Sequence, residues 1–296
     1  MKEQFIDHKF NGASLKLIET ENGILVEYAR QGYRLSLRQL YYQLVARDLF
    51  PEDRRWSWRN NKWVRDANGT KNAIPNYKWL GEYVSTARLA GLLDWDMIED
   101  RNRVASVPAA WKSPAEIVRS AASQFRVDRW QGQPYHVEVM VEKDALSGIL
   151  QPVCRELHVR FTANKGYSSS SAMYEAGQRM RNAKRLGRKI VVFYFGDHDP
   201  SGIDMTRDID ERLAQFARTT KMEVRRLALN WNQVEEWQPP ENPAKETDSR
   251  YQAYADEFGE SSWELDAVEP RTLASLVREN VTDLIDHEQW DEVMER

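Results

Sequence analysis

The chain has 296 residues, 41% of them hydrophobic, and a formal net charge of -4. That length suggests one large domain or two ordinary ones, with enough apolar residues for a packed core. The single cysteine, Cys154, excludes an internal disulfide framework and a cysteine-based zinc site.

Charge and hydropathy also bear on partners and location. An acidic total charge does not exclude nucleic acid, because local basic patches decide that contact. No apolar run approaches the length of a transmembrane helix, and the N-terminal segment MKEQFIDHKF lacks the apolar core of a signal peptide. We therefore expect a cytoplasmic protein with no membrane partner.

The first part of the chain is expected to be mainly helical. Apolar positions between residues 14 and 31 predict one broken helix or two short ones, because Asn22 and Gly23 interrupt the pattern. Ser36 is a favoured N-cap before a clearer helix over 37–48. Helix, glycine-containing turn and helix form the outline of a helix-turn-helix, although many helical hairpins share it. Further helices are expected over 76–90 and 114–125.

A basic, tryptophan-rich segment lies at residues 51–76 and could be the wing of a winged helix or an inserted loop. Cations interleaved with aromatic rings suit phosphate contacts and base stacking. The alternative is a solvated loop whose tryptophans pack on the adjoining helices. The candidate DNA-binding residues are Arg54, Arg55, Arg59, Lys62 and Arg65.

The motif QGQP at 131–134 is the strongest candidate for a domain boundary, which divides the chain into 1–133 and 134–296. After it, strand and helix patterns alternate. Such alternation predicts an α/β fold, a mainly parallel sheet with helices on both faces. The predicted strands are 137–141, 159–162, 190–195 and 222–229.

Three carboxylates follow predicted strands. Asp197 and Asp199 come directly after the apolar run 190–195, and Glu142 follows the first strand of the sheet. Ligands bind outside the carboxyl ends of parallel strands, so neighbouring strands would bring these side chains together. Carboxylate oxygens are the ligands that Mg²⁺ prefers. The alternative is that Asp197 and Asp199 are only turn and N-cap residues.

Several motifs resemble those of one protein family. VEKDAL at 141–146 and GDHDPSG at 196–202 resemble the Toprim domain. NKGYSS at 164–169 and ELDA at 264–267 are similar to motifs of the A subunit of type IIB topoisomerases (topoisomerase VI) and the related meiotic double-strand-break proteins. LSLRQLYYQLVARDLF at 35–50 resembles the winged-helix segment of those proteins. The resemblance implies a winged helix-turn-helix domain followed by a Toprim domain.

The resemblance also implies functional residues and partners. Glu142, Asp197 and Asp199 would bind Mg²⁺ or Mn²⁺, and Lys143 and Lys165 would face phosphate. The chain would act as a homodimer on DNA. No Walker-type phosphate loop is present, so any ATPase would be a separate subunit. Glu264 and Asp266 would form an additional acidic site.

Of the two adjacent tyrosines, the resemblance implies that Tyr42 is the nucleophile. Helical spacing agrees, because Tyr41 lies four residues from Leu37 and Val45 on the apolar face, whereas Tyr42 lies four residues after Arg38. A nearby guanidinium would favour the phenolate and hold the scissile phosphate. The alternative is that both tyrosines are packing residues.

The function implied by the resemblance is Mg²⁺-dependent DNA strand cleavage, and three hypotheses stay open. Tyr42 could form a covalent phosphotyrosine link to DNA. The Toprim site could instead activate water and hydrolyse the phosphodiester as an endonuclease. The chain could also be a non-catalytic DNA-binding protein with a structural metal site.

Overall fold

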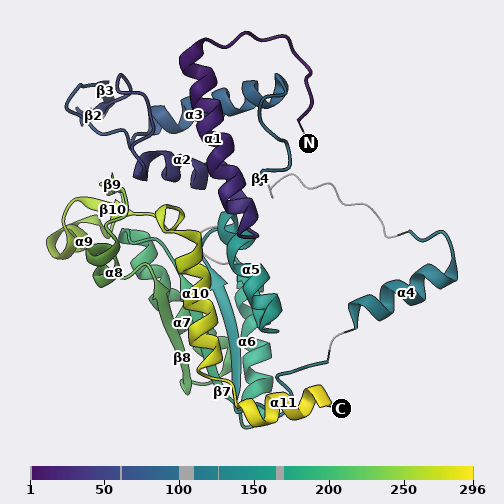
Figure 1. Cartoon of the computed structure of the whole chain (residues 1–296). Helices are drawn as coiled ribbons and strands as arrows, with labels where there is room; N and C mark the ends of the chain where they lie inside the picture. The colour runs from purple at the N-terminus through teal and green to yellow at the C-terminus, as the bar shows by residue number, and fades with distance from the viewer. Residues whose placement is uncertain (1, 61, 100–109, 126, 165–169, 296) are drawn as a thin grey trace.

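A computed structural model describes residues 2–60, 62–99, 110–125, 127–164 and 170–295 (Figure 1). Its centre is a four-stranded sheet with the strand order β6-β5-β7-β8, and every pairing is parallel. The predicted α/β class with a parallel sheet is confirmed. The strands are β5 (Tyr135–Val141), β6 (Arg160–Ala163), β7 (Lys189–Phe195) and β8 (Met222–Ala228).

Helices cover both faces of this sheet, as the alternation of strand and helix patterns predicted. The residues of β7 alternate between two hydrophobic clusters, with Val191 and Phe193 in one and Val192 and Tyr194 in the other. A continuous apolar run is what a strand buried on both faces requires. The first cluster includes residues of α5 (Ser147–Glu156) and α10 (Pro270–Thr282), and the second includes residues of α6 (Ser170–Arg185) and α7 (Pro200–Ala217).

The N-terminal helices form a core of their own, in residues 17–98. The prediction of a broken first helix is wrong, because α1 is continuous through Asn22 and Gly23. The Asn22 amide donates to the carbonyl oxygens of Ile18 and Leu92, so it is satisfied inside the helix. The elements are α1 (Gly12–Arg30), β1 (Leu35–Ser36), α2 (Leu37–Ala46), α3 (Ile74–Leu89) and β4 (Ile98–Glu99), with β1 and β4 paired in parallel.

The helix α2 begins where its sequence predicts. Ser36 accepts a hydrogen bond from the backbone of Gln39, whose side chain accepts one from the backbone of Ser36 in return. This reciprocal capping box satisfies donors that the first turn leaves unpaired. The basic segment that follows forms an antiparallel hairpin of β2 (Trp56–Arg59) and β3 (Lys62–Arg65).

The helix α4 (Pro114–Gln124) buries no residue, and Figure 1 shows it away from the rest of the chain. Within the described ranges, no helix is long and apolar enough to span a membrane.

The C-terminal part of the chain contacts both the central sheet and the N-terminal helices. An isolated antiparallel bridge joins Trp263 to His198 in the loop after β7. The short 3-10 helix η3 (Leu265–Ala267) then packs against α2. The sequence patterns did not predict α8, α9 or α11. The remaining elements are η2 (Asp144–Leu146), α8 (Trp231–Trp237), β9 (Glu241–Pro243), α9 (Tyr251–Phe258), β10 (Ser261–Trp263) and α11 (His287–Glu295), with β9 and β10 antiparallel.

Candidate functional site

The register of the central strands brings Glu142 and Asp197 together. Val141 at the end of β5 pairs with Phe195 at the end of β7, so the residues that follow both strands lie at one edge of the sheet. Glu142 Oε2 accepts a hydrogen bond from the backbone N–H of Asp197 at 2.9 Å, and both side chains are buried. This is the edge at which the sequence predicted a cluster of carboxylates.

Lys143 lies at the centre of the acidic cluster. Its Nζ is 2.5 Å from Asp197 Oδ2, 3.0 Å from Glu264 Oε2 and 3.7 Å from Asp266 Oδ2. Burial alone would lower the pKa of this ammonium group, but the charges of the three carboxylates outweigh burial and hold that pKa above its usual value. The lysine therefore carries a fixed positive charge among the acids.

Two carboxyl groups near this lysine have raised pKa values despite its positive charge. Asp266 is 2% exposed, and neither of its carboxylate oxygens has a hydrogen-bond partner among the described residues. Burial raises the pKa of Asp266 to about 6. Burial and the charge of Asp197 raise the pKa of Glu142 to about 8. These raised values mark places where an added cation would lower the electrostatic free energy.

Asp199 differs from the expected arrangement. Its Oδ1 accepts hydrogen bonds from the backbone N–H of Gly202 at 2.6 Å and the hydroxyl of Ser201 at 3.0 Å, so it caps α7. Over the described residues, no three His, Cys, Asp or Glu side chains form a group that could hold a metal ion. The oxygen donors of Glu142 and Asp197 suit a hard divalent cation. Asp199 would join them through Oδ2, because Oδ1 is the oxygen that caps α7.

Arg226 holds the loop that carries these aspartates, and the sequence patterns did not identify it. Its guanidinium group donates to the carbonyl oxygens of Gly196, Asp197 and Gly202. Burial lowers the pKa of this guanidinium group. The available signal was the charged pair Arg225-Arg226 within the strand β8, because a cation buried in a strand needs several acceptors.

Tyr42 lies close to the same cluster but is not open to solvent. It is 3% exposed, and its hydroxyl accepts a hydrogen bond from Asn242 Nδ2 at 2.9 Å. Asn242 belongs to β9, so a segment distant in sequence covers this face of α2. Burial, followed by the charge of Glu264, raises the pKa of the Tyr42 phenol, and the Asn242 hydrogen bond acts in the opposite direction.

The two tyrosine hydroxyls are joined through two asparagines. Tyr41 donates to Asn72 Oδ1 at 2.9 Å, and its oxygen accepts the backbone N–H of Ala73 at 2.7 Å. Asn72 Nδ2 in turn donates to Asn242 Oδ1 at 3.2 Å. The predicted core position of Tyr41 is confirmed at 4% exposure, but Tyr42 is as deeply buried.

A chain of ion pairs connects α2 to the carboxyl edge of the sheet. Arg38 Nη1 lies 2.6 Å from Glu264 Oε2, and the same oxygen lies 3.0 Å from Lys143 Nζ. Lys143 then contacts Asp197. The predicted residues from the two halves of the chain therefore meet in one site. Lys165, predicted to face phosphate, lies outside the described residues.

The basic hairpin satisfies most of its cations locally. Arg59 pairs with Asp66, and Arg55 pairs with Glu52 at 2.9 Å. The Arg54 guanidinium lies 3.5 Å from the centre of the Trp79 ring.

Of the hairpin tryptophans, Trp56 donates its indole N–H to Asn76 at 2.9 Å, whereas Trp58 is 43% exposed. Arg65 lies over the Trp56 ring at 4.3 Å, and Lys62 is exposed.

Comparisons with protein-family models, with curated proteins and with solved structures each found no match to this chain. An arginine, a lysine and a group of carboxylates lie along one path of ion pairs, and the buried Tyr42 phenol lies near enough for the charges of that path to shift its pKa. Such a set can bind a phosphate, stabilise charge that develops on it, and supply either a phenol or an activated water as nucleophile.

Proposed function

We propose that this chain cleaves DNA strands in a Mg²⁺-dependent reaction, with Tyr42 as the nucleophile. The observation that supports this most is the path of ion pairs from Arg38 through Glu264 and Lys143 to Asp197. It joins the helix that carries Tyr42 to the carboxylates at the sheet edge. The motifs of the topoisomerase VI A subunit fall on these same residues.

The proposed mechanism assigns a role to each group. Arg38 and Lys143 hold the scissile phosphate by charge-assisted hydrogen bonds. The Tyr42 phenol gives up its proton and its oxygen attacks phosphorus, so that a phosphotyrosine bond replaces one P–O bond of the DNA backbone. The departing DNA oxygen takes up a proton and leaves as a free hydroxyl end. Glu142, Asp197 and Oδ2 of Asp199 would hold Mg²⁺, which would stabilise charge on the phosphate oxygens when bound. Asn242 stabilises the phenolate by donating to its oxygen.

Hydrolysis is the second candidate, and the burial of Tyr42 favours it. A phenol that is 3% exposed, with a raised pKa, is poorly placed to reach a phosphate. In that reaction the carboxylates activate water and Tyr42 only packs. Transesterification requires the buried Tyr42 oxygen to become accessible to the scissile phosphate, which hydrolysis does not.

A plasmid assay tests the proposal and separates the two reactions. Supercoiled DNA is incubated with the chain and Mg²⁺, then run with and without protease treatment. Protein attached to the cut ends supports transesterification, and free ends support hydrolysis. Asp197→Asn removes a charge without adding bulk and should abolish cleavage. Intact plasmid with wild-type protein, or full cleavage by Asp197→Asn, would contradict the proposed function. A homodimer and a separate ATPase subunit stay predictions.

A further inference from the structure

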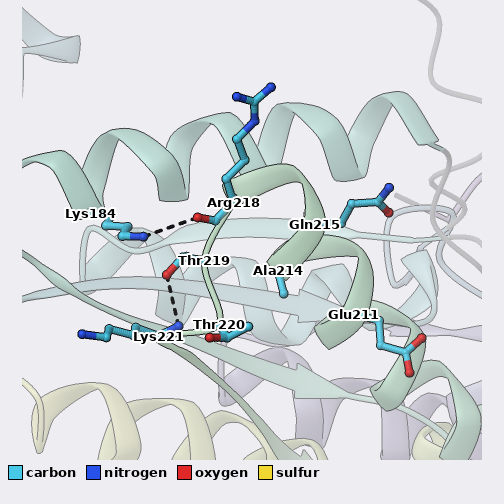
Figure 2. Close-up of a pocket in the computed structure, with 8 residues that line it drawn as sticks. All are labelled: Lys184, Glu211, Ala214, Gln215, Arg218, Thr219, Thr220 and Lys221. Carbon is cyan, nitrogen blue, oxygen red and sulfur yellow. Dashed lines mark hydrogen bonds between the residues drawn. The ribbon is translucent and has the colours of Figure 1, made fainter.

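The strand β8 forms one edge of the central sheet, and no strand of the described residues lies on its outer side (Figure 1). Alternate backbone N–H and C=O groups of an edge strand point away from its neighbour and can pair with another chain. β8 has seven residues, whereas β6 at the other edge has four. Thr220 and Lys221, directly before β8, line an open depression of about 680 Å³, so the start of the strand is accessible (Figure 2).

The two ends of β8 differ in how their backbone is covered. The carbonyl oxygen of Arg226 accepts a hydrogen bond from the Asn230 side chain at 3.0 Å, and that of Leu227 accepts one from Gln233 at 2.8 Å. Over residues 222–225, by contrast, no side chain of the described ranges bonds the backbone. The first part of the strand is therefore the part that a second strand could join.

One face of this part of β8 carries an acid and a base. Glu223 and Arg225 are two residues apart, so their side chains leave the strand on the same face. They lie 2.5 Å apart and stay 53% and 38% exposed, so each can contact a further charge. Charged side chains protect many edge strands, because pairing with another chain would bury them or set like charges together. Whether they do so here depends on the register.

One register of self-pairing sets opposite charges together. In a two-fold symmetric pair the strands run antiparallel, and the axis lies between two copies of one residue. An axis at Glu223 or at Arg225 would place that residue opposite its own copy, which is a like-charge contact. An axis at Met222 would leave only that residue of each strand paired within β8. An axis at Val224 places Glu223 opposite Arg225 of the partner subunit.

We infer that β8 is the surface through which two copies of this chain associate, with the strands antiparallel and the axis at Val224. Each of the two Glu223 carboxylates then faces a guanidinium group of the other copy, and opposite charges in directly opposed positions stabilise an antiparallel pair. The register keeps the two faces of the sheet in line across the axis, so one sheet runs through both copies. This inference does not rest on the proposed cleavage, and it gives the predicted homodimer a surface.

Reversal of single charges tests the pairing. Sedimentation velocity of the full chain measures the fraction of dimer as concentration rises, and wild type should form a dimer. Glu223→Arg and Arg225→Glu each set like charges opposite one another, so each alone should lose the dimer. An equal mixture of the two variants should regain it, because one strand then carries two bases and the other two acids. Each substitution changes the net charge of -4 by two, so both variants stay acidic and attraction between total charges does not explain the regained dimer.

Matched variants on α1 control for the change in charge. Lys16 and Glu19 are exposed on that helix, away from β8 in the sequence. Glu19→Arg and Lys16→Glu reverse the same charges as the two β8 variants and should form the dimer as wild type does. Loss of the dimer in these controls would show that total charge governs association, and the inference would be wrong.

A disulfide tests the register. Opposite Cα atoms of an antiparallel pair lie about 4.5–5.5 Å apart, a separation that a disulfide spans. Val224→Cys should therefore give a covalent dimer on a non-reducing gel after mild oxidation. Met222→Cys should not, because it would lie opposite Arg226 of the partner subunit. Cys154 is buried and serves as the background in both variants. Equal cross-linking of the two variants would exclude the axis at Val224.

The remaining outcomes decide whether a second copy joins this edge. A wild-type chain that is monomeric at every concentration would overturn the inference and leave β8 to a strand of a different protein. A dimer that persists in both single charge variants would place the interface elsewhere on the chain and would also overturn it. Charge variants that stay monomeric when mixed would exclude the opposed Glu223 and Arg225. None of these results bears on cleavage, which the plasmid assay tests separately.

Discussion

The side-chain amide of Asn242 donates a hydrogen bond to the Tyr42 hydroxyl at 2.9 Å across 200 residues of sequence. Asn242 also accepts a hydrogen bond from Asn72, which accepts one from Tyr41. Both tyrosines of α2 are thus fixed from outside the helix, one by the segment before α3 and the other by β9. These hydrogen bonds determine how each tyrosine responds to substitution.

Asn242→Asp should slow the proposed transesterification at least tenfold. A carboxylate cannot donate to the Tyr42 oxygen, and its charge would raise the pKa of the phenol further. A hydrogen bond to a charged group contributes about 1.5–3 kcal/mol, which is about tenfold to a hundredfold in rate. The formation of covalent protein–DNA adduct over time measures the effect. Ser262→Ala is the control, because the Ser262 hydroxyl donates to the backbone carbonyl oxygens of Asn242 and Pro243 and leaves the Asn242 side chain on Tyr42 unchanged. Adduct formation by Asn242→Asp at the wild-type rate would exclude this role.

Tyr41→Phe should cost more stability than Tyr42→Phe, whereas only Tyr42→Phe should affect the chemistry. Tyr41→Phe leaves the buried N–H of Ala73 and Oδ1 of Asn72 without their partner, so it should cost about 1–3 kcal/mol of unfolding free energy. Tyr42→Phe removes one hydrogen bond and should cost about 0.5–1.5 kcal/mol. Urea unfolding measures both costs. Only Tyr42→Phe should abolish the covalent adduct, and the reverse pattern would refute the assignment of the nucleophile.

Lys143→Gln should destabilise the chain by about 3–5 kcal/mol, because it leaves buried carboxylates without their cation. Mg²⁺ should restore part of this loss, since a ligand that binds only the folded state stabilises it by about 2.7 kcal/mol at a hundredfold excess over Kd. Thermal melts in EDTA and in Mg²⁺ measure both effects. Lys16→Gln, at an exposed site on α1, is the control and should stay within about 0.5 kcal/mol of wild type. If Mg²⁺ does not raise the melting temperature of Lys143→Gln, the carboxylates do not bind this ion.

Glu21 should make stability fall as pH rises. Burial raises its pKa from 4.5 to about 8, and within the described part of the chain its carboxylate oxygens have no hydrogen-bond partner. Between these two values the folded state holds a proton that the unfolded state has lost. The unfolding free energy should therefore decrease by up to about 1.4 kcal/mol per pH unit in this window and level off above it.

The difference between wild type and Glu21→Gln isolates this effect from other titrations, because glutamine has no proton to lose. Urea unfolding from pH 4.5 to 8.5 (roughly the predicted window) measures the difference. Glu19 is an exposed position on the same helix, so the unfolding free energy of Glu19→Gln should change with pH as that of the wild type does. A constant difference between Glu21→Gln and wild type across the window would show that Glu21 does not take up a proton on folding.

Local patterns predicted much of the sheet and its helices. The apolar run of β7 predicted a strand buried on both faces, and this prediction is confirmed, since helices cover both faces of the sheet. Ser36 predicted the start of α2, because capping acts within one turn. The sequence pattern wrongly predicted a break in the first helix at Asn22 and Gly23, where a hydrogen bond to Leu92 satisfies the asparagine amide. Propensity is a weak signal that tertiary contacts override.

The sequence by itself determined which groups stand at the ends of strands, since Glu142 and Asp197 follow apolar runs whose direction is set by the chain. Only the tertiary structure decided their partners. Strand register paired Glu142 with the backbone of Asp197, and the return of the chain through β9 and η3 brought Asn242 to Tyr42 and Glu264 to Arg38. These contacts depend on residues 55 to 226 positions apart, and helical or strand periodicity reaches only a few residues.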